Sequence, residues 1–123
     1  MYYISAPGIS RFLVEMVSTP EDLKQGLSGR DSLLPRQGML FMFPSLGKQS
    51  MWMPNMNFPL DIVWVDQDKI IVKIEKNVTP CIDNHNCKSY VSGYPVLYAI
   101  ELNAGDATRI GLQVGLKLAF NAK

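Results

Sequence analysis

The sequence is divided into short apolar segments, each about the length of one strand and each bounded by residues that favour turns. Residues 39–43 run up to Pro44, and residues 60–65 are followed by the polar segment 66–69. Segments of this length that are rich in aromatic and β-branched side chains are typical of strands and too short for most helices. The chain is therefore expected to be built mainly from strands.

Seven such segments are predicted to be strands, and most of the remaining chain is predicted to be turn or loop. The strands are residues 11–17, 39–43, 50–53, 60–65, 70–75, 96–102 and 116–120. The four residues 66–69 are suited to a turn, which predicts a hairpin between the segments that flank them. The polar segment 77–95 contains two prolines and both cysteines, which predicts a long loop.

Two short helices are also predicted. Thr19 is a suitable N-cap because a proline and two acidic residues follow it, and Gly26 or Gly29 would end this helix after two turns. A second helix is expected to be capped by Asn103 and to run through Arg109. The doubly wound α/β class is disfavoured, because it needs helices between most strands.

The predicted fold is a single strand-dominated α+β domain over residues 1–123. Its strands would form either a bent, mostly antiparallel sheet or a partly closed β-barrel, because both arrangements protect the sheet edges. No internal repeat or interdomain linker is visible in the sequence. One hydrophobic core is therefore expected.

The charge distribution argues against two classes of partner. The formal net charge is +1, and no two basic residues are adjacent. Phosphate binding requires clustered positive charge, so neither nucleic acid nor an anionic membrane surface is expected as a partner. No segment approaches the roughly 18 apolar residues of a membrane span, and no signal peptide is visible. We expect a cytoplasmic protein if the chain is complete, and an exported or periplasmic one if a leader was removed.

Six motifs follow one another along nearly the whole chain. They are Gly26-Leu27-Ser28-Gly29-Arg30 with Leu33, residues 38–43, Trp52-Met53 followed by residues 59–63, Pro80-Cys81 with Cys87 and Tyr90, residues 100–105, and Gly111 with Gly115. In these motifs and their order the chain resembles a bacterial and archaeal family known as domain of unknown function 192 (DUF192). It departs from the family pattern at Pro54-Asn55 and at Leu116. The resemblance implies a compact β-rich domain and supplies no established activity, cofactor or catalytic residue.

The two cysteines are six positions apart in the predicted loop. Cys81 and Cys87 suit a disulfide in an oxidising compartment or two unpaired thiols in the cytosol. Alternatively, both thiols could bind zinc or copper together with His85, the only histidine, and with Asp83 as an oxygen donor. Structural zinc sites usually draw ligand pairs from two chain segments, and no second pair exists here.

Two acidic residues interrupt strands that are otherwise apolar. An unpaired charge at such a position is costly, so each acid should face outward or have a partner. Asp61 and Glu101 are expected either to bond to backbone N–H groups or to Arg30, or to face a ligand. If both lie in one cleft with Arg30, two carboxyl groups and a guanidinium could catalyse hydrolysis by acid and base. This arrangement is the enzymatic alternative.

Aromatic residues near polar ones suggest a binding surface instead. A shallow groove formed by Trp52, Asn55, Asp61 and Tyr90 could recognise a small ligand or a peptide. Five of the seven methionines fall between Met39 and Met56, which favours core packing but would also suit Cu(I). The favoured function is a ligand- or partner-binding accessory domain, with no cofactor expected.

Overall fold

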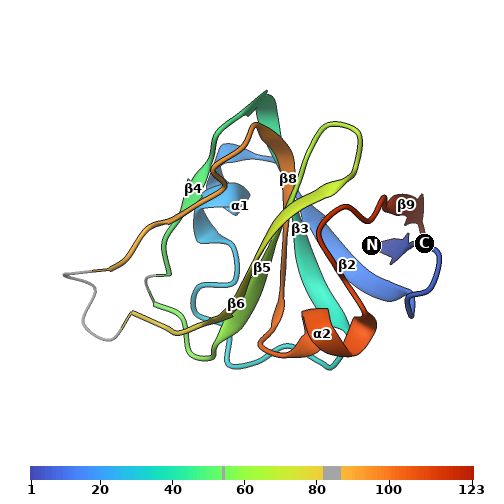
Figure 1. Ribbon diagram of the computed structural model, residues 1–123. Helices are drawn as coiled ribbons and strands as arrows, with labels where there is room; N and C mark the ends of the chain where they lie inside the picture. Colours follow the sequence, from blue (N-terminus) through green and yellow to red (C-terminus); the bar gives the residue numbers. More distant parts are fainter. Residues whose placement is uncertain (54, 82–86) are drawn as a thin grey trace.

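The structure is a computed structural model that describes residues 1–53, 55–81 and 87–123. Seven of the strands form one sheet in the order β6, β5, β8, β3, β2, β1 and β9 (Figure 1). Its strands are β1 (Tyr2–Ser5), β2 (Phe12–Val17), β3 (Gln37–Gly47), β5 (Leu60–Val65), β6 (Ile71–Val78), β8 (Val96–Asn103) and β9 (Ala119–Ala122). The prediction of a strand-dominated α+β fold is confirmed. The sheet is bent and is not closed into a barrel.

The sheet is mixed, because one of its strand pairs is parallel. β2 and β3 run parallel, and the other five pairings are antiparallel. Helix α1 (Pro20–Gln25) lies in the connection between β2 and β3. This connection brings the chain back along the sheet, so that β3 runs in the same direction as β2. A second sheet of two short strands, β4 (Ser50–Met51) and β7 (Tyr90–Val91), lies beside the larger one.

Helix α1 begins and ends as its sequence predicts. The Thr19 side chain accepts a hydrogen bond from the backbone N–H of Asp22 at 3.2 Å, and Pro20 occupies the first turn. Gly26 ends the helix at a φ of 50° and a ψ of −128°, a conformation that side chains other than glycine rarely adopt.

Helix α2 (Asp106–Ile110) starts later than predicted. Its N-cap is Gly105, and Asn103 still belongs to β8. The Asn103 side-chain amide donates instead to the carbonyl of Leu33 at 3.0 Å. The preference of Asn for helix caps was therefore a misleading signal at this position, because a contact distant in sequence uses its side chain.

Both faces of the central strands are buried, which divides the core into two clusters. One cluster packs against α2 and includes Val63 and Leu102; the other packs near α1 and includes Ile62 and Phe41. In Figure 1, α1 and β4 lie to one side of β5 and β8, and α2 lies to the other. All six residues of β5 are buried for this reason.

Several boundaries differ from the predictions, and the short strand β7 lies within the predicted loop 77–95. β3 continues through Pro44 to Gly47, and its register with β8 shifts between Met42 and Gly47, which accommodates a residue without a backbone N–H. β1 was not predicted, and β9 starts at Ala119 and not at residue 116. Among the described residues, no helix is both long and apolar enough to cross a bilayer.

Candidate functional site

Glu101 lies in the middle of the sheet, on the face that packs near α1. On β8 it is opposite Met39 of β3 and Ile62 of β5, and both of these side chains belong to the cluster on that face. Directly opposed residues in a sheet point to the same side. The carboxyl group therefore enters a layer of apolar side chains, and only 3% of the residue surface is exposed.

A pocket opens onto this carboxyl group. Its volume is about 190 Å³, and its lining is mostly apolar and aromatic. The lining residues are Leu23, Lys24, Gln25, Gly26, Leu27, Ser28, Phe41, Phe43, Ser50, Met51, Trp52, Met53, Met56 and Glu101. We call this cavity the Glu101 pocket.

The backbone of Gly26 lies close above the carboxyl group. A Cβ atom at this position would be 3.8 Å from Glu101 Oε1 and 3.1 Å from Cζ of Phe41. The end of α1 therefore approaches the sheet closely because Gly26 has no side chain. This approach places the C-terminal turn of the helix in the pocket wall.

Among the residues that the structure describes, Glu101 has no partner that would stabilise its charge. No hydrogen bond or ion pair joins its carboxyl group to another residue within the described ranges of the chain. Burial raises the pKa of Glu101 from 4.5 to about 8. At neutral pH the group is mainly a carboxylic acid that can both donate and accept hydrogen bonds.

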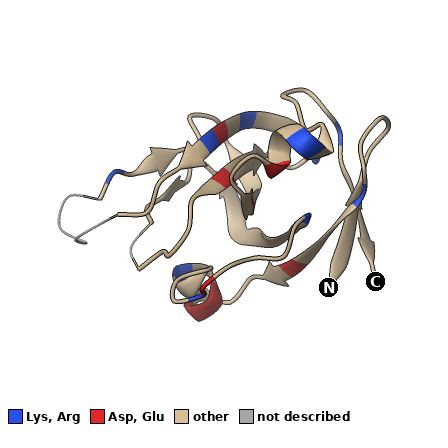
Figure 2. Ribbon diagram, turned by 90° about the horizontal axis from the view of Figure 1, so that it is seen from below, with Lys and Arg blue, Asp and Glu red and all other residues tan. Residues whose placement is uncertain are grey.

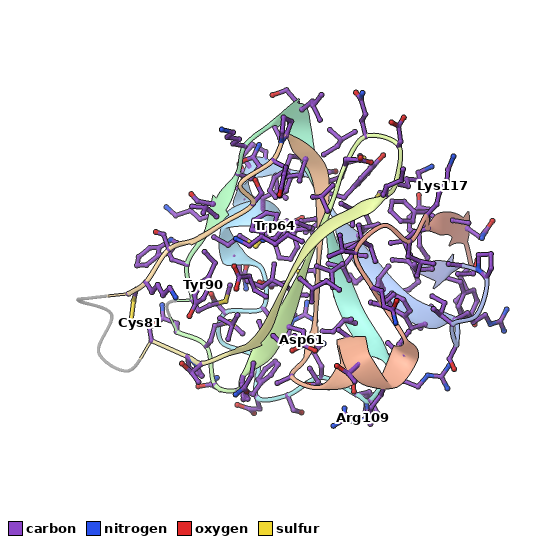
Figure 3. All side chains as sticks on the ribbon, in the orientation of Figure 1. Asp61, Trp64, Cys81, Tyr90, Arg109 and Lys117 are labelled. Carbon is purple, nitrogen blue, oxygen red and sulfur yellow. A yellow bond between two sulfur atoms is a disulfide. The ribbon has the colours of Figure 1, made fainter. Side chains whose placement is uncertain are left out.

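Asp61 serves a different purpose, on the opposite face of the sheet. Its register partner on β8 is Leu102, so its side chain points away from Glu101 and towards α2 (Figure 3). Its carboxylate accepts three backbone hydrogen bonds of 3.0 Å, from Asn77, Gly105 and Ala107. Asp61 thereby joins the end of β6 to the start of α2.

Replacing Asp61 with Ala should therefore destabilise the domain by about 3 kcal/mol, because three backbone N–H groups, one in a buried and two in partly buried hydrogen bonds, would lose their acceptor. Urea unfolding at neutral pH measures this loss. Asp31 is exposed and provides the control, since its replacement with Ala should change stability by less than about 0.5 kcal/mol. Equal stability of the two variants would contradict the structural role of Asp61.

Arg30 does not join the two acids. Its guanidinium pairs with the Glu15 carboxylate at 2.9 Å, on the exposed surface. Glu15 lies on the face of Glu101, but Met39 separates the two across the sheet, about 10 Å at the usual strand spacing. The acid, base and anion-binding group of the hydrolase alternative are thus not brought into one cleft.

The residues of the predicted groove are only partly brought together. Trp52 lines the Glu101 pocket and is 55% exposed. The carbonyl of Asn55 accepts a hydrogen bond from Gly29, next to the pocket wall, and Tyr90 pairs with Met51 across the small sheet. Asp61 lies on the far face and is not part of this surface.

Cys81 and Cys87 form a disulfide. Both sulfur atoms are therefore in the bridge and not free as thiolate ligands, while His85 and Asp83 lie outside the described residues. Within the described ranges, no cluster of three or more His, Cys, Asp or Glu residues could hold a metal ion. The backbone N–H of Cys81 donates to the carbonyl of Met53 at 3.2 Å, so the bridge adjoins the pocket wall.

Most of the pocket lining was not predicted as a site. Met51, Met53 and Met56 were interpreted as core residues, and two of them are indeed buried while also lining the pocket. Phe41 and Gly26 gave no functional signal in the sequence. Two signals were usable: an acid within an apolar strand pointed to Glu101, and an aromatic residue near polar ones pointed to Trp52.

Comparisons with known proteins place the chain in a family. The DUF192 family model, described as "Uncharacterized ACR", matches residues 3–120. A crystal structure from Sinorhizobium meliloti 1021, described as a "putative transcription regulator", is 32% identical with a TM-score of 0.85, over 97% of this chain and 91% of that one. A protein of unknown function from Novosphingobium aromaticivorans DSM 12444 is 28% identical with a TM-score of 0.85, over 96% and 82%. No curated protein matches the chain. The chain belongs to the DUF192 family.

Proposed function

We propose that this domain is a binding module, without catalytic activity of its own, that takes a small ligand or a single side chain of a peptide into the Glu101 pocket. The observation that carries the proposal is a carboxyl group that is almost fully buried, lacks a partner among the described residues, and borders a cavity. Its oxygen atoms are accessible from the cavity, because the described residues contain only one fully buried side-chain polar atom without a hydrogen-bond partner, Nε1 of Trp64. A bound ligand would supply the partner that the carboxyl group lacks.

The walls and size of the pocket support a small ligand with an apolar part. Trp52, Phe41 and Phe43 provide aromatic surface, and Glu101 provides one polar group at depth, which is the usual composition of a ligand site. Sites for drug-sized molecules have volumes of about 300 to 1,000 Å³. At about 190 Å³ this pocket suits a smaller molecule.

We propose no nucleic-acid partner, although the relative from Sinorhizobium meliloti is described as a "putative transcription regulator". Lys and Arg residues are scattered over the described surface and interspersed with acidic ones (Figure 2), and the net charge is +1. Phosphate contacts need clustered positive charge. A regulatory role would have to act through ligand recognition.

The disulfide favours one of the two expected compartments. Disulfides persist in oxidising environments and are rare in the cytosol. The bridge between Cys81 and Cys87 therefore supports an exported or periplasmic location, as expected if a leader was removed. Intact mass of the protein purified from its natural host, without reductant, tests this assignment, because the bridge lowers the mass by two hydrogens.

Binding can be tested with a fragment screen read by tryptophan fluorescence and by NMR shifts. Fragments that bind in the pocket should perturb Trp52, and replacing Trp52 with Ala should weaken their binding about tenfold through lost aromatic contact. Tyr94 is exposed to the same degree, outside the pocket, and Tyr94→Ala is the control. Fragment binding that is indifferent to Trp52, or silence across broad panels, would contradict the proposal.

A further inference from the structure

We infer that the ligand of the Glu101 pocket is a small organic cation, an ammonium or methylated ammonium group carried on a short apolar body. This inference rests on the proposed function, and it adds the chemical class of the ligand. Glu101 is the only acidic group among the described residues of the lining. It lies on the sheet, and the lining also contains aromatic and thioether side chains. A cationic group is the one partner that pairs with its ionised form and also suits these walls.

The aromatic walls favour a cation over a neutral polar group. Trp52, Phe41 and Phe43 line the pocket together, and the face of an aromatic ring attracts ammonium groups electrostatically. Trp gives the strongest such attraction among the aromatic side chains. An anionic ligand would lie next to the carboxyl group of Glu101, and Lys24, the one basic residue of the described lining, is exposed, so this class is disfavoured.

A single metal ion fits the pocket less well than a molecule. Met51, Met53 and Met56 offer thioether sulfur, which binds Cu(I). The volume of about 190 Å³, however, corresponds to about six water molecules. This space is much larger than one ion requires, and it matches a ligand of a few non-hydrogen atoms.

Glu101 is the main electrostatic determinant of ligand binding in the pocket, because the charged groups around it are exposed, paired or on the opposite face. On α1, Lys24 lines the pocket but is exposed, while Glu21 and Asp22 are exposed and outside the lining. Across the sheet, Met39 and Ile62 flank Glu101 and do not titrate. Beyond Met39, Glu15 is neutralised by Arg30 at the surface, and Asp61 points to the opposite face.

Binding of a cation should release a proton. A permanently charged ligand pairs with the ionised carboxylate, so the proton of Glu101 leaves to the buffer as the complex forms. With a pKa of about 8 for the buried group, the ionised fraction rises roughly 90-fold between pH 6 and pH 9. The apparent affinity for the cation should rise by about the same factor.

Calorimetry with two matched probes tests the inference. Choline carries a permanent quaternary ammonium, and 3,3-dimethylbutan-1-ol has the same shape with carbon in place of the charged nitrogen. Choline should bind more tightly as pH rises from 6 to 9 and release about 0.9 proton per complex at pH 7, measured in buffers of different ionisation enthalpy. The neutral probe should bind weakly and show no such rise. Methylammonium and tetramethylammonium, which differ in size, extend the series.

Glu101→Gln is the decisive variant, because it keeps the shape and the hydrogen-bonding capacity of the neutral acid. It should weaken cation binding at pH 8.5 by at least about 30-fold and leave the neutral probe unaffected. Lys24→Gln is the paired control at the pocket rim, and it should strengthen cation binding slightly, most of all at low salt.

The remaining outcomes separate this inference from the proposed function. If the neutral probe binds as well as choline, or if fragments of another class bind while none of the three cations does, the ligand is not a cation and the binding role stands. If Cu(I), measured by competition with a chelator, binds more tightly than the organic cations, the ligand is not an organic cation and the binding role again stands. If the pocket binds nothing from any class, both the inference and the proposed function fail.

Discussion

Replacing Glu101 with Gln should stabilise the domain by about 5 kcal/mol at pH 9 and change its stability little at pH 4. An acid buried among apolar side chains resists ionisation, which raises the pKa of Glu101 from 4.5 to about 8 in the folded state. Gln has nearly the same shape as the protonated acid and does not titrate. The variant should therefore lose the pH dependence that Glu101 imposes.

The direction of the effect follows from proton binding in the two states. Below pH 4.5 the Glu101 carboxyl is protonated in both the folded and the unfolded chain, so it contributes no pH dependence. Between pH 4.5 and about 8 the unfolded chain ionises while the folded one remains protonated, so the free energy of unfolding falls as the pH rises. Above pH 8 both states are ionised and the loss is complete.

Urea unfolding of the two proteins between pH 4 and pH 9 measures this difference. The exposed acid Glu21, replaced with Gln, is the control, and its stability curve should follow that of the wild type within about 0.5 kcal/mol. A Glu101→Gln curve parallel to the wild type would show that the carboxyl group ionises normally in the folded protein. In that case the group would be open to water or paired, and it would not be the buried acid that the structure shows.

A cost of this size bears on the function. A buried acid without a partner destabilises the empty domain at neutral pH, and an apolar residue or a Gln in its place would avoid the cost. Such costs are typical of positions where binding or catalysis requires a destabilising group. If the ligand is a cation, the bound state recovers part of the cost through ion pairing.

The helices and strands could be predicted from the sequence more reliably than the contacts between them. Turn-forming residues bound the hairpin of β5 and β6, and Thr19 with its proline determines the start of α1; both signals are local in the chain and both predictions are confirmed. Asn103 failed as a cap because a contact with Leu33, 70 residues earlier in the chain, uses its amide. Tertiary contacts of this kind override local preference.

The separation of Asp61 from Glu101 illustrates why the site could not be predicted in full. Each acid interrupts an apolar strand, and the sequence gives the alternation within each strand but not the register between them. In the structure Asp61 is opposite Leu102, one residue beyond Glu101. A shift of one residue moves a side chain to the other face of a sheet, and the two acids consequently lie on different faces. The pocket depends on this register and on the closeness of Gly26 to the sheet.

Within the sheet, Gly38 of β3 permits a similarly close approach between β3 and β8. A Cβ atom on Gly38 would overlap the carbonyl oxygen of Glu101 and would lie 2.7 Å from Cδ2 of Leu102. Real Cβ atoms essentially never make contacts this short, and the first of them involves the backbone of β8, which cannot rotate away as a side chain can. Gly38→Ala should therefore force β3 and β8 apart and destabilise the domain by about 4 kcal/mol or more.

Gly47 of the same strand provides a matched control for this substitution. A Cβ atom on Gly47 would meet no atom within 4 Å, and its φ lies outside the positive range. Ala at this position should therefore be neutral or slightly stabilising, because it reduces the entropy of the unfolded chain. Urea unfolding compares the two variants directly. Gly38→Ala should also weaken any ligand binding in the Glu101 pocket, because the displaced segment of β8 carries Glu101 itself. Equal stability of the two variants would mean that β3 and β8 do not approach as closely as the structure shows, and the depth of the carboxyl group would then have to be reconsidered.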